Sequence, residues 1–489
     1  MADYDLAIIG GGLNGVCIAR DAAGRGLRVI LLEQGDLGSA ASSASPRLIH
    51  GDLALLEHRA LLRVRAALAE RDTWLRIAPH LVRPMRFAIP AHSDERPLWL
   101  LRAGLWFYDR LSSRPGLPAS STVDITHHPI GDALKRPFGT AFEYSDCVAD
   151  DSRLVIANAL DAAERGAAIC TGARCIRAEQ TEVWRLVVID RGQRKVFTAR
   201  ALANATGAWT ASIAETVLRV PPPGLATPVQ ISQIIVRRLF DNDNVYVFQN
   251  SDRRLVFAMP YERDFTLIGT VRHPFKGDPA AVSMPAPDIA YLCEAANRYF
   301  RERVEPSDVI ATRSGANMAV NPTSSHPLDG AITLRATRRK APLLALFGGD
   351  ITTARRRAER AVSMLTPFYP MSRSWTANSP LPGGDFAWQR FDAQVEAACE
   401  RWQFLTEREA QRLVGAYGSR LAAVLGEAKN RADLGPAFGP ELTGAEVRYL
   451  MANEWARFPD DILWRRSKLG LTIPPADREA LAVFMASPS

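Results

Sequence analysis

The residues most suggestive of chemistry form a glycine cluster near the start of the chain, Gly10-Gly11-Gly12-Leu13-Asn14-Gly15. The cluster follows an apolar run at residues 4–9 and precedes an Ala-rich helical pattern at 14–25. Gly10 permits a tight turn, Gly12 lets the backbone approach a pyrophosphate, and Gly15 lets the helix pack on the strand. Free N–H groups at the helix start would face the phosphates, so the motif predicts a dinucleotide site. A glycine turn without a ligand is the plain structural alternative.

An acid at the end of the next apolar run, residues 28–33, strengthens this prediction. Glu33 follows Gly15 at about the spacing expected for a carboxylate that accepts hydrogen bonds from ribose hydroxyls. A carboxylate there disfavours a 2′-phosphate, which leaves FAD or NAD as the cofactor. Two later strand-to-glycine turns, at 204–209 (NATGAW) and 347–353 (FGGDITT), favour FAD. The second turn opens a helix whose N–H groups would face a flavin oxygen that gains negative charge on reduction.

The elements that must hold these motifs belong to a mixed α/β chain. Helical periodicity marks residues 60–77, 153–167 and most of 387–489, whereas 229–271 shows strands and turns typical of an antiparallel sheet. One of those turns is Asn250-Ser251-Asp252. The fold class predicted is α/β: a Rossmann-like FAD-binding domain, an antiparallel-sheet substrate domain and a helical C-terminal domain.

Composition excludes several classes of protein. The chain has 489 residues and a net charge of +7 that is spread out, which suits an anionic ligand or an acidic membrane surface but not nucleic acid. Its six cysteines have no metal-site spacing, so we expect no metal and a reduced, cytoplasmic protein. The apolar stretch 98–111 is too short and too charged to span a bilayer. Within it, Trp99, Trp106, Phe107 and Tyr108 either face a membrane or quinone or are buried against the core, and we favour burial.

Seven stretches of the sequence resemble the FAD-dependent glycerol-3-phosphate dehydrogenases of the bacterial respiratory type. They run over nearly the whole chain: IIGGGLNGVCIARDAAGRGLRVILLE, SSASPRLIHGDLALLEH, FEYSDCVADDSRLVIANA, NATGAW, LIGTVRHPFKGDP, LFGGDITTARRRAE and EWARFPDDILWRRSKLGL. The resemblance implies hydride transfer from the substrate to flavin N5 and electron transfer onward to a membrane quinone.

The resemblance also implies the domain limits and the cofactor contacts. The FAD-binding domain would comprise 1–90, 145–215 and 330–365, the substrate domain 91–144 and 216–329, a linker 366–386, and the C-terminal domain 387–489. The residues expected to contact FAD are Gly10, Gly12, Asn14, Gly15, Glu33, Ser42, Ser43, Ser45, Arg47, Leu48, Ala205, Thr206, Gly207, Gly349, Asp350, Ile351 and Thr352. For the three serines, local turn formation is an equal alternative.

The departures from the family pattern concern the substrate. Where the family has groups that hold a phosphate or assist proton removal, this chain has Ala54, Gln233, Asn317 and Asp350. A phosphate dianion requires Arg or Lys, and Asp350 would repel it. Arg272 and Arg313 stand where the family has other residue types; either they have moved into the site or they are solvated sheet residues. The arginines 355, 356, 357 and 360 are interpreted as a solvated helix face.

Three functions follow as hypotheses. The first is an FAD-dependent dehydrogenase or oxidase acting on a small molecule other than glycerol 3-phosphate, such as an amine or amino-acid-like compound. Its catalytic candidates are Asp350, Gln233, Asn317, Arg313 and His50, although His50 is equally well explained as structural. The second is the family's ordinary reaction, and the third is a flavin-binding protein without redox catalysis. Quinone or oxygen would accept the electrons, contact with the inner face of the cell membrane would be peripheral, and a homodimer stays open.

Overall fold

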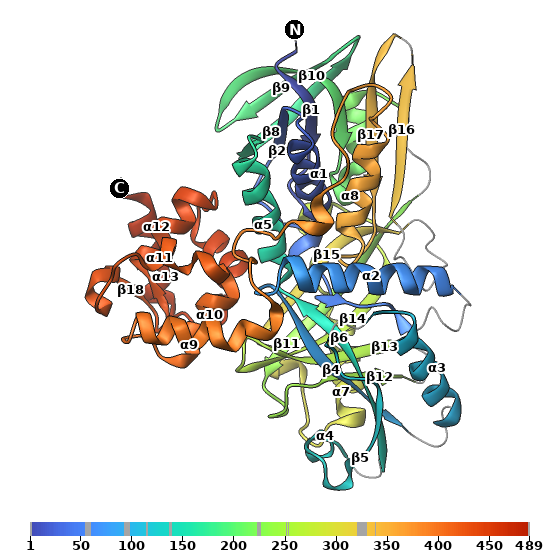
Figure 1. The fold of residues 1–489 in the computed structure, drawn as a ribbon, viewed down its shortest axis with the longest axis vertical. Coiled ribbons are helices and arrows are strands. Elements are labelled where there is room, and N and C mark those ends of the chain that lie inside the picture. Colours follow the sequence, from blue (N-terminus) through green and yellow to red (C-terminus); the bar gives the residue numbers. More distant parts are fainter. Residues whose placement is uncertain are drawn as a thin grey trace.

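The computed structural model describes residues 2–53, 60–91, 98–113, 116–135, 139–222, 226–250, 252, 254–319, 330–337 and 339–487. Two large sheets form the body of the molecule, and a helical C-terminal region packs beside them (Figure 1). Position 54 and Ser251, on which sequence predictions fall, lie outside the described residues.

The first sheet carries the glycine motif. Its central order β17-β10-β1-β2-β7 is parallel, and antiparallel β16, β8 and β9 extend it. Its strands are β1 (Tyr4–Ile9), β2 (Val29–Glu33), β7 (Ala168–Thr171), β8 (Ala173–Gln180), β9 (Trp184–Asp190), β10 (Gln193–Asn204), β16 (Ala331–Thr337) and β17 (Lys340–Phe347). Helix α1 (Leu13–Gly24) packs between α5 (Asp151–Glu164) and α8 (Ala354–Ser363). Because both faces of the parallel strands are covered, β1 and β2 are almost continuously apolar. The loops after β1, β2, β10 and β17 therefore meet at one edge.

The second sheet is mainly antiparallel, which confirms the strand pattern predicted for 229–271. Its main order is β15-β11-β14-β13-β12-β4-β6-β3, with β5 beside β6. The strands are β3 (Leu48–Ile49), β4 (Val82–Ala91), β5 (Ser121–Asp124), β6 (Thr140–Ala149), β11 (Thr227–Arg237), β12 (Val245–Gln249), β13 (Leu255–Tyr261), β14 (Phe265–Pro274) and β15 (Ala311–Ala319). Helix α7 (Ala286–Tyr299) packs against β11, β13 and β14.

Two chain segments lie elsewhere than the sequence suggested. Strands β3 and β4 precede the expected boundary at residue 90, yet they pair with β6 in the second sheet. Residues 366–386, expected to be a linker, pack on the first domain: Leu381 is buried in its core, and the Trp375 indole N–H donates to the carbonyl of Asp21. A Cβ on Gly24 would come within 2.1 Å of Trp375, so the glycine admits the indole. Local periodicity shows neither the pairing of β3 and β4 with β6 nor the packing of residues 366–386 on the first domain.

The C-terminal region has its own hydrophobic core, centred on Leu413, Leu442, Leu450 and Ile462. As predicted, it is mostly helical. Its main elements are α9 (Phe391–Arg401), α10 (Glu407–Tyr417), α11 (Leu421–Leu425), α12 (Gly444–Asn453), the π-helical turn Asp461–Arg466 and α13 (Pro475–Ala486), with a small hairpin of β18 (Ala437–Phe438) and β19 (Leu442–Thr443).

Two helices border the second sheet, α2 (Leu61–Ile77) and α3 (Leu98–Arg110). The favoured burial of the α3 aromatic residues is wrong for three of them, because Trp99, Trp106 and Phe107 are 71%, 54% and 38% exposed. Tyr108 is buried. Within the described ranges, no helix is long and apolar enough to cross a membrane.

Candidate active site

A cavity of about 1980 Å³ lies where the loops of the first sheet meet the face of the second. It is lined by the glycine loop after β1, the ends of β2 and β10, the turn after β17, and strands β11, β14 and β15. Helix α3 contributes Leu98, Leu100 and Leu101 at another part of the wall. The volume exceeds the 300–1,000 Å³ typical of single-ligand pockets. The cavity thus has room for a long cofactor together with a substrate.

The glycine loop has the geometry that a pyrophosphate requires. Gly10 has φ +111°, and a Cβ there would lie 2.6 Å from the carbonyl oxygen of Ala205. A Cβ on Gly15 would lie 1.9 Å from the carbonyl oxygen of Gly10, so Gly15 permits close packing of helix on strand. Gly12 is the N-cap of α1 and lines the cavity, and a Cβ there would meet only Ser42 Oγ, at 3.0 Å. The open space in front of Gly12 and the helix start fits a pyrophosphate.

Glu33 lies at the expected end of the cavity and its carboxylate is already oriented. Oε2 accepts from the Gly11 N–H at 2.7 Å, and Oε1 accepts from the Gly35 N–H at 2.8 Å. Burial raises the pKa of Glu33, and the two backbone bonds oppose this shift. Glu33 lines the cavity. The lone pairs that these two bonds leave free would accept hydrogen bonds from ribose hydroxyls.

We expect Glu33→Ala to weaken FAD binding roughly 10- to 150-fold, because hydrogen bonds to a charged acceptor contribute about 1.5–3 kcal/mol. Glu33→Gln is the matched control, since it keeps the shape and one acceptor oxygen, and its loss should be smaller. Fluorescence titration of apoprotein with FAD measures both. An unchanged dissociation constant for Glu33→Ala would show that Glu33 does not reach the ribose.

The flavin end of the cavity is bordered by three turns that the sequence pointed to. Leu48 and Ser42 line it on one side, Ala205, Thr206 and Gly207 at the end of β10, and Gly349, Asp350 and Ile351 after β17. Arg357 connects two of these parts: its guanidinium donates to Asn14 Oδ1 at 2.8 and 3.0 Å and to the carbonyl of Asp350 at 3.0 Å. The glycine loop and the β17 turn are therefore fixed to each other.

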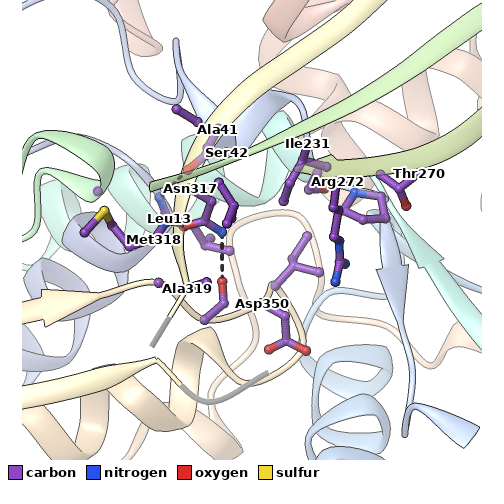
Figure 2. A pocket seen from close by; sticks show the side chains of 18 of the residues that line it. Leu13, Ala41, Ser42, Ile231, Thr270, Arg272, Asn317, Met318, Ala319 and Asp350 are labelled. Atoms are coloured by element: carbon purple, nitrogen blue, oxygen red, sulfur yellow. Dashed lines mark hydrogen bonds between the residues drawn. The ribbon is translucent and has the colours of Figure 1, made fainter. Parts of the chain in front are cut away.

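The substrate end is formed by adjacent strands of the second sheet and by the β17 turn. Asn317 on β15 lies opposite Val229, and Arg272 on β14 lies opposite Ile231, so these side chains share the cavity face of the sheet. Figure 2 shows Arg272 entering the cavity from β14 and Asp350 entering it from the turn. Asn317 donates its amide to the carbonyl of Gly349 at 3.3 Å, which ties the sheet to this turn.

The two oxygens of Asp350 differ. Oδ1 accepts from the Thr353 backbone N–H at 3.1 Å and from the Thr353 hydroxyl at 2.6 Å. Oδ2 is buried and has no hydrogen-bond partner among the described residues. The turn therefore orients one carboxylate oxygen and leaves the other for a ligand. Asp52 also lines this part of the cavity.

His50 lines the cavity above a buried polar network. Its backbone N–H donates to Thr352 Oγ1, and the next N–H, of Gly51, donates to the Tyr108 hydroxyl at 2.7 Å. Tyr108 in turn donates to Asp146, which pairs with Arg71 at 2.8 Å. Burial raises the pKa of Asp146, and Arg71 opposes that shift. The network fixes the backbone around His50, so His50 has a defined position at the cavity wall.

Two residues expected to line the substrate site do not line it. Gln233 is 1% exposed and its side chain meets Ala44 and Arg313. Arg313 forms an ion pair with Asp151 at 2.6 Å and donates to the carbonyl of Ser43 at 2.6 Å. Both lie beneath the 41–45 loop, whose other side faces the cavity. Their role in this arrangement is to hold that loop.

Four expected cofactor contacts are also absent from the cavity wall: Gly15, Ser43, Arg47 and Thr352. Gly15 packs helix on strand, and Arg47 is held by the Ala149 carbonyl, Glu262 and the Tyr261 ring. The Ser43 hydroxyl donates to Ala40 within its own turn, which is the local role left open for the serines. Ser45 lines the wall, but its hydroxyl donates to Asp151.

Comparison with known proteins shows to which family the chain with this site belongs. Residues 5–350 match the model of the FAD dependent oxidoreductase family, and residues 374–486 match the C-terminal domain of alpha-glycerophosphate oxidase. The chain is 42% identical to the glycerol-3-phosphate dehydrogenase of Pseudomonas aeruginosa, over 99% of this chain and 95% of that protein. The chain belongs to the FAD-dependent glycerol-3-phosphate dehydrogenase family.

Another relative is named for a different substrate. D-erythritol 1-phosphate dehydrogenase of Brucella abortus is 39% identical over 97% of this chain and 96% of that protein. Among solved structures, the glycerol-3-phosphate dehydrogenase of Bacillus halodurans complexed with FAD superposes with a TM-score of 0.76, at 22% identity, covering 99% of this chain and 91% of that one. That likeness confirms the fold.

Membership of this family makes the protein an FAD-dependent dehydrogenase or oxidase. The residues present fit FAD: the α1 start faces open space beside Gly12, and Glu33 stands at the ribose end. When bound, FAD supplies a hydride acceptor at N5 of its ring. The chain's own part is to bind the cofactor, orient the substrate carbon against that ring and keep water out.

Sequence reasoning missed Arg357, which it placed on a solvated helix face. In α8, Arg355 and Arg357 are buried, whereas Arg356 and Arg360 are exposed. Arg355 pairs with Glu70 at 2.6 Å. Helical spacing places Arg356 and Arg360 on a different side of α8 from Arg355 and Arg357. Only the residues that these arginines contact could have shown which side faces inward. Asp52 was also missed, and nothing local to it marks a site.

Proposed function

We propose that this protein oxidises a small molecule other than glycerol 3-phosphate by hydride transfer to N5 of FAD. We further propose that the substrate carries an ammonium group, as amines and amino acids do. The observation that carries this proposal is the charge of the substrate end, where Arg272 and Asp350 enter the cavity together and Asp52 lines it as well.

The charges at this end complement a zwitterion better than a dianion. Burial lowers the pKa of Arg272, and the Asp52 and Asp350 carboxylates raise it, which supports their being near neighbours. Among the described residues, a phosphate dianion bound at Arg272 would also meet the Asp350 carboxylate. Repulsion between like charges is large where water is scarce. An amino acid would place its carboxylate on Arg272 and its ammonium on the unpaired Asp350 Oδ2.

The same arrangement supports a chemical role for Asp350. Oxidation of an amine requires loss of one proton from nitrogen and of a hydride from the adjacent carbon, which leaves an iminium product. Asp350 Oδ2 would accept the proton, and FAD the hydride. Arg272 and Asn317 would hold the substrate so that its C–H bond faces the ring. His50, whose backbone N–H donates to Thr352 beside Asp350, would limit how far the substrate can rotate.

A second candidate is a phosphorylated polyol. The relatives at 42% and 39% identity, a glycerol-3-phosphate and a D-erythritol 1-phosphate dehydrogenase, favour it. Arg272 would then hold the phosphate at the described part of the site. A flavin-binding protein without catalysis is a third outcome.

An anaerobic screen separates these candidates. Purified FAD-loaded protein is mixed with amines, amino acids, hydroxy acids and polyol phosphates, and loss of the oxidised flavin absorbance is followed. The proposal expects reduction by an amine or amino acid. It also expects Asp350→Asn to weaken that substrate roughly tenfold or more, since a charge-assisted hydrogen bond is lost. Reduction by polyol phosphates alone would establish the second candidate, a phosphorylated polyol as substrate. The absence of any reduction would establish the third, a flavin-binding protein without catalysis.

The electron acceptor is proposed to be a quinone or oxygen, with peripheral membrane contact through α3. This helix lines the cavity through Leu100 and Leu101 and exposes Trp99 and Trp106 to solvent. Leu62, at the start of α2, is 83% exposed. Exposed aromatic and aliphatic side chains with nearby arginines are typical of an interfacial helix. A homodimer stays a prediction.

We expect binding to anionic vesicles that salt weakens, because any contact is peripheral and partly electrostatic. Trp99→Ser/Trp106→Ser should reduce co-sedimentation roughly tenfold or more, since each buried apolar side chain contributes about 1.5–3 kcal/mol. Phe458→Ser, which removes a 61% exposed aromatic residue from the C-terminal domain, is the matched control. Equal losses in the two variants would contradict the assignment to α3.

A further inference from the structure

We propose that residues 454–471 of the C-terminal domain, here called the docking segment, are part of the FAD-binding machinery. The segment EWARFPDDILWRRSKLGL was singled out by its family-like sequence, and none of its residues lines the cavity. It contacts two loops that line opposite ends of the cavity, and it does so through loop residues that do not themselves line the cavity. FAD affinity then depends on how this domain docks.

At the ribose end the docking segment forms ion pairs with the loop that follows Glu33. Asp36, three residues beyond Glu33, is 8% exposed and receives two arginines from the far end of the chain. Arg466 binds both of its oxygens, one of them at 2.7 Å, and Arg465 binds Oδ2. Arg466 also donates to the carbonyl of Glu454 at 2.7 Å, so its position is fixed within the segment.

The loop that contains Asp36 also orients the Glu33 carboxylate. Gly35 donates its N–H to Glu33 Oε1, and its carbonyl accepts from Gly172 at 3.0 Å. Gly38 donates to the carbonyl of Gly11 in the glycine loop. Displacement of Asp36 would therefore move both the ribose acceptor and the support of the pyrophosphate loop. Asp36 acts as a positioning residue through Glu33.

At the flavin end the docking segment reaches the start of α5. Lys468 pairs with Asp150, and burial raises the pKa of Asp150 while Lys468 and Arg47 lower it, to about 2 overall. The next residue, Asp151, accepts from the Ser45 hydroxyl at 2.9 Å, and Ser45 lines the cavity. A third pair fixes the same helix, since Arg153 binds Glu454 and the Ala416 carbonyl.

These contacts couple cofactor binding to domain docking. Asp36, Glu454, Arg466 and Lys468 are all less than 10% exposed, and a buried charge that loses its partner is strongly destabilising. The two loops and the docking segment should consequently shift together rather than separately. Coupling in binding equilibria is reciprocal, so if docking favours FAD binding, FAD must favour docking to the same extent.

Hydrogen exchange on the wild-type protein tests the reciprocal effect. Apoprotein and FAD-loaded protein are compared by mass spectrometry of peptides that cover 454–471. We expect FAD to slow exchange in the docking segment, although it does not contact the ligand. Peptides from α13 (Pro475–Ala486), in the same domain but outside these contacts, should change little. Equal exchange in the docking segment with and without FAD would overturn the proposal.

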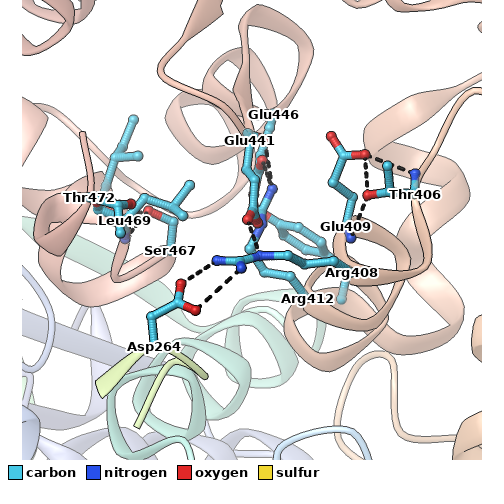
Figure 3. A network of polar contacts seen from close by, with 12 residues as sticks. Asp264, Thr406, Arg408, Glu409, Arg412, Glu441, Glu446, Ser467, Leu469 and Thr472 are labelled. Carbon is cyan, nitrogen blue, oxygen red and sulfur yellow. Dashed lines mark hydrogen bonds and ion pairs between the residues drawn. The ribbon is translucent and has the colours of Figure 1, made fainter. Parts of the chain in front are cut away.

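A pair of matched variants tests the direct effect. Asp36→Asn keeps the shape but loses the charge, and we expect the FAD dissociation constant to rise roughly tenfold or more. The control is the pair shown in Figure 3, between Asp264, in the turn that joins β13 to β14, and Arg408 of the C-terminal domain. The two side chains are 2.6 Å apart, and neither residue lines the cavity. Asp264→Asn should leave FAD affinity within about twofold, because this pair is exposed.

Titration with ADP distinguishes an effect of Asp36 on the position of Glu33 from an effect on the stability of the fold alone. ADP reports the ribose and pyrophosphate end, so Asp36→Asn should weaken ADP by a factor similar to that for FAD. A merely structural role would lower the unfolding temperature of the apoprotein while both dissociation constants stayed unchanged, and that result would refute the proposal. Should Asp36→Asn not fold, the exchange comparison on the wild-type protein decides.

Discussion

Replacing Gly12 by Val should abolish FAD binding while leaving the protein folded. Gly12 has an extended backbone, φ −78° and ψ 177°, which Val adopts without strain. Its added Cβ would meet only Ser42 Oγ within the protein, at 3.0 Å, so the side chain would project into the space that the pyrophosphate needs. A ligand excluded from that space also loses the N–H groups at the start of α1.

The measurement is the flavin content of purified protein, with circular dichroism to confirm folding. Gly104→Ala is the matched control, because Gly104 also lines the cavity but has no atom within 4 Å of an added Cβ. That variant should retain FAD. Normal flavin content in Gly12→Val would contradict the assignment of the glycine loop.

The cofactor half of the site could be predicted from sequence because its determinants are local. A strand, a glycine loop and a helix within residues 4–25, followed by a strand that ends in Glu33, define the loop geometry almost by themselves. The structure places Gly10, Gly12, Asn14 and Glu33 on the cavity wall.

The substrate half could not be predicted in the same way, because its residues are brought together by pairing between distant strands. Arg272 and Arg313 stand on β14 and β15, the two strands that pair with β11, yet of these two residues only Arg272 lines the cavity. Arg313 is covered by the 41–45 loop, which packs so closely that a Cβ on Gly315 would lie 2.8 Å from Ala41 Cα. That covering loop, and hence the fate of Arg313 and Gln233, has no signature in local periodicity.

The exposure of α3 illustrates a second limit. An apolar, aromatic helix is equally consistent with burial and with a binding surface. The structure exposes Trp99 and Trp106 and buries Leu105 and Tyr108 on the other side. Which side packs depends on the core beneath, formed by Leu68, Phe87 and Tyr144 from three other segments.

Glycerol 3-phosphate should reduce the bound flavin very slowly or not at all. From the sequence resemblance we infer that Asn317 and Asp350 stand where the family pattern has cations, and both line the described part of the site. Each lost charged hydrogen bond costs about 1.5–3 kcal/mol, so two losses predict a rate roughly 10²- to 10⁴-fold below that of an ordinary family member. The Asp350 carboxylate adds repulsion. Gln233, which is buried beneath the 41–45 loop, takes no part in this argument.

Anaerobic stopped-flow with millimolar glycerol 3-phosphate tests the central claim, that the substrate end is not built for a phosphate dianion. The wild-type protein is compared with Asn317→Arg/Asp350→Lys, which restores cations at both positions. We predict that the wild-type flavin stays oxidised for minutes and that the double variant is bleached faster. Bleaching of the wild-type flavin within seconds would contradict the account and assign this protein the ordinary reaction of its family.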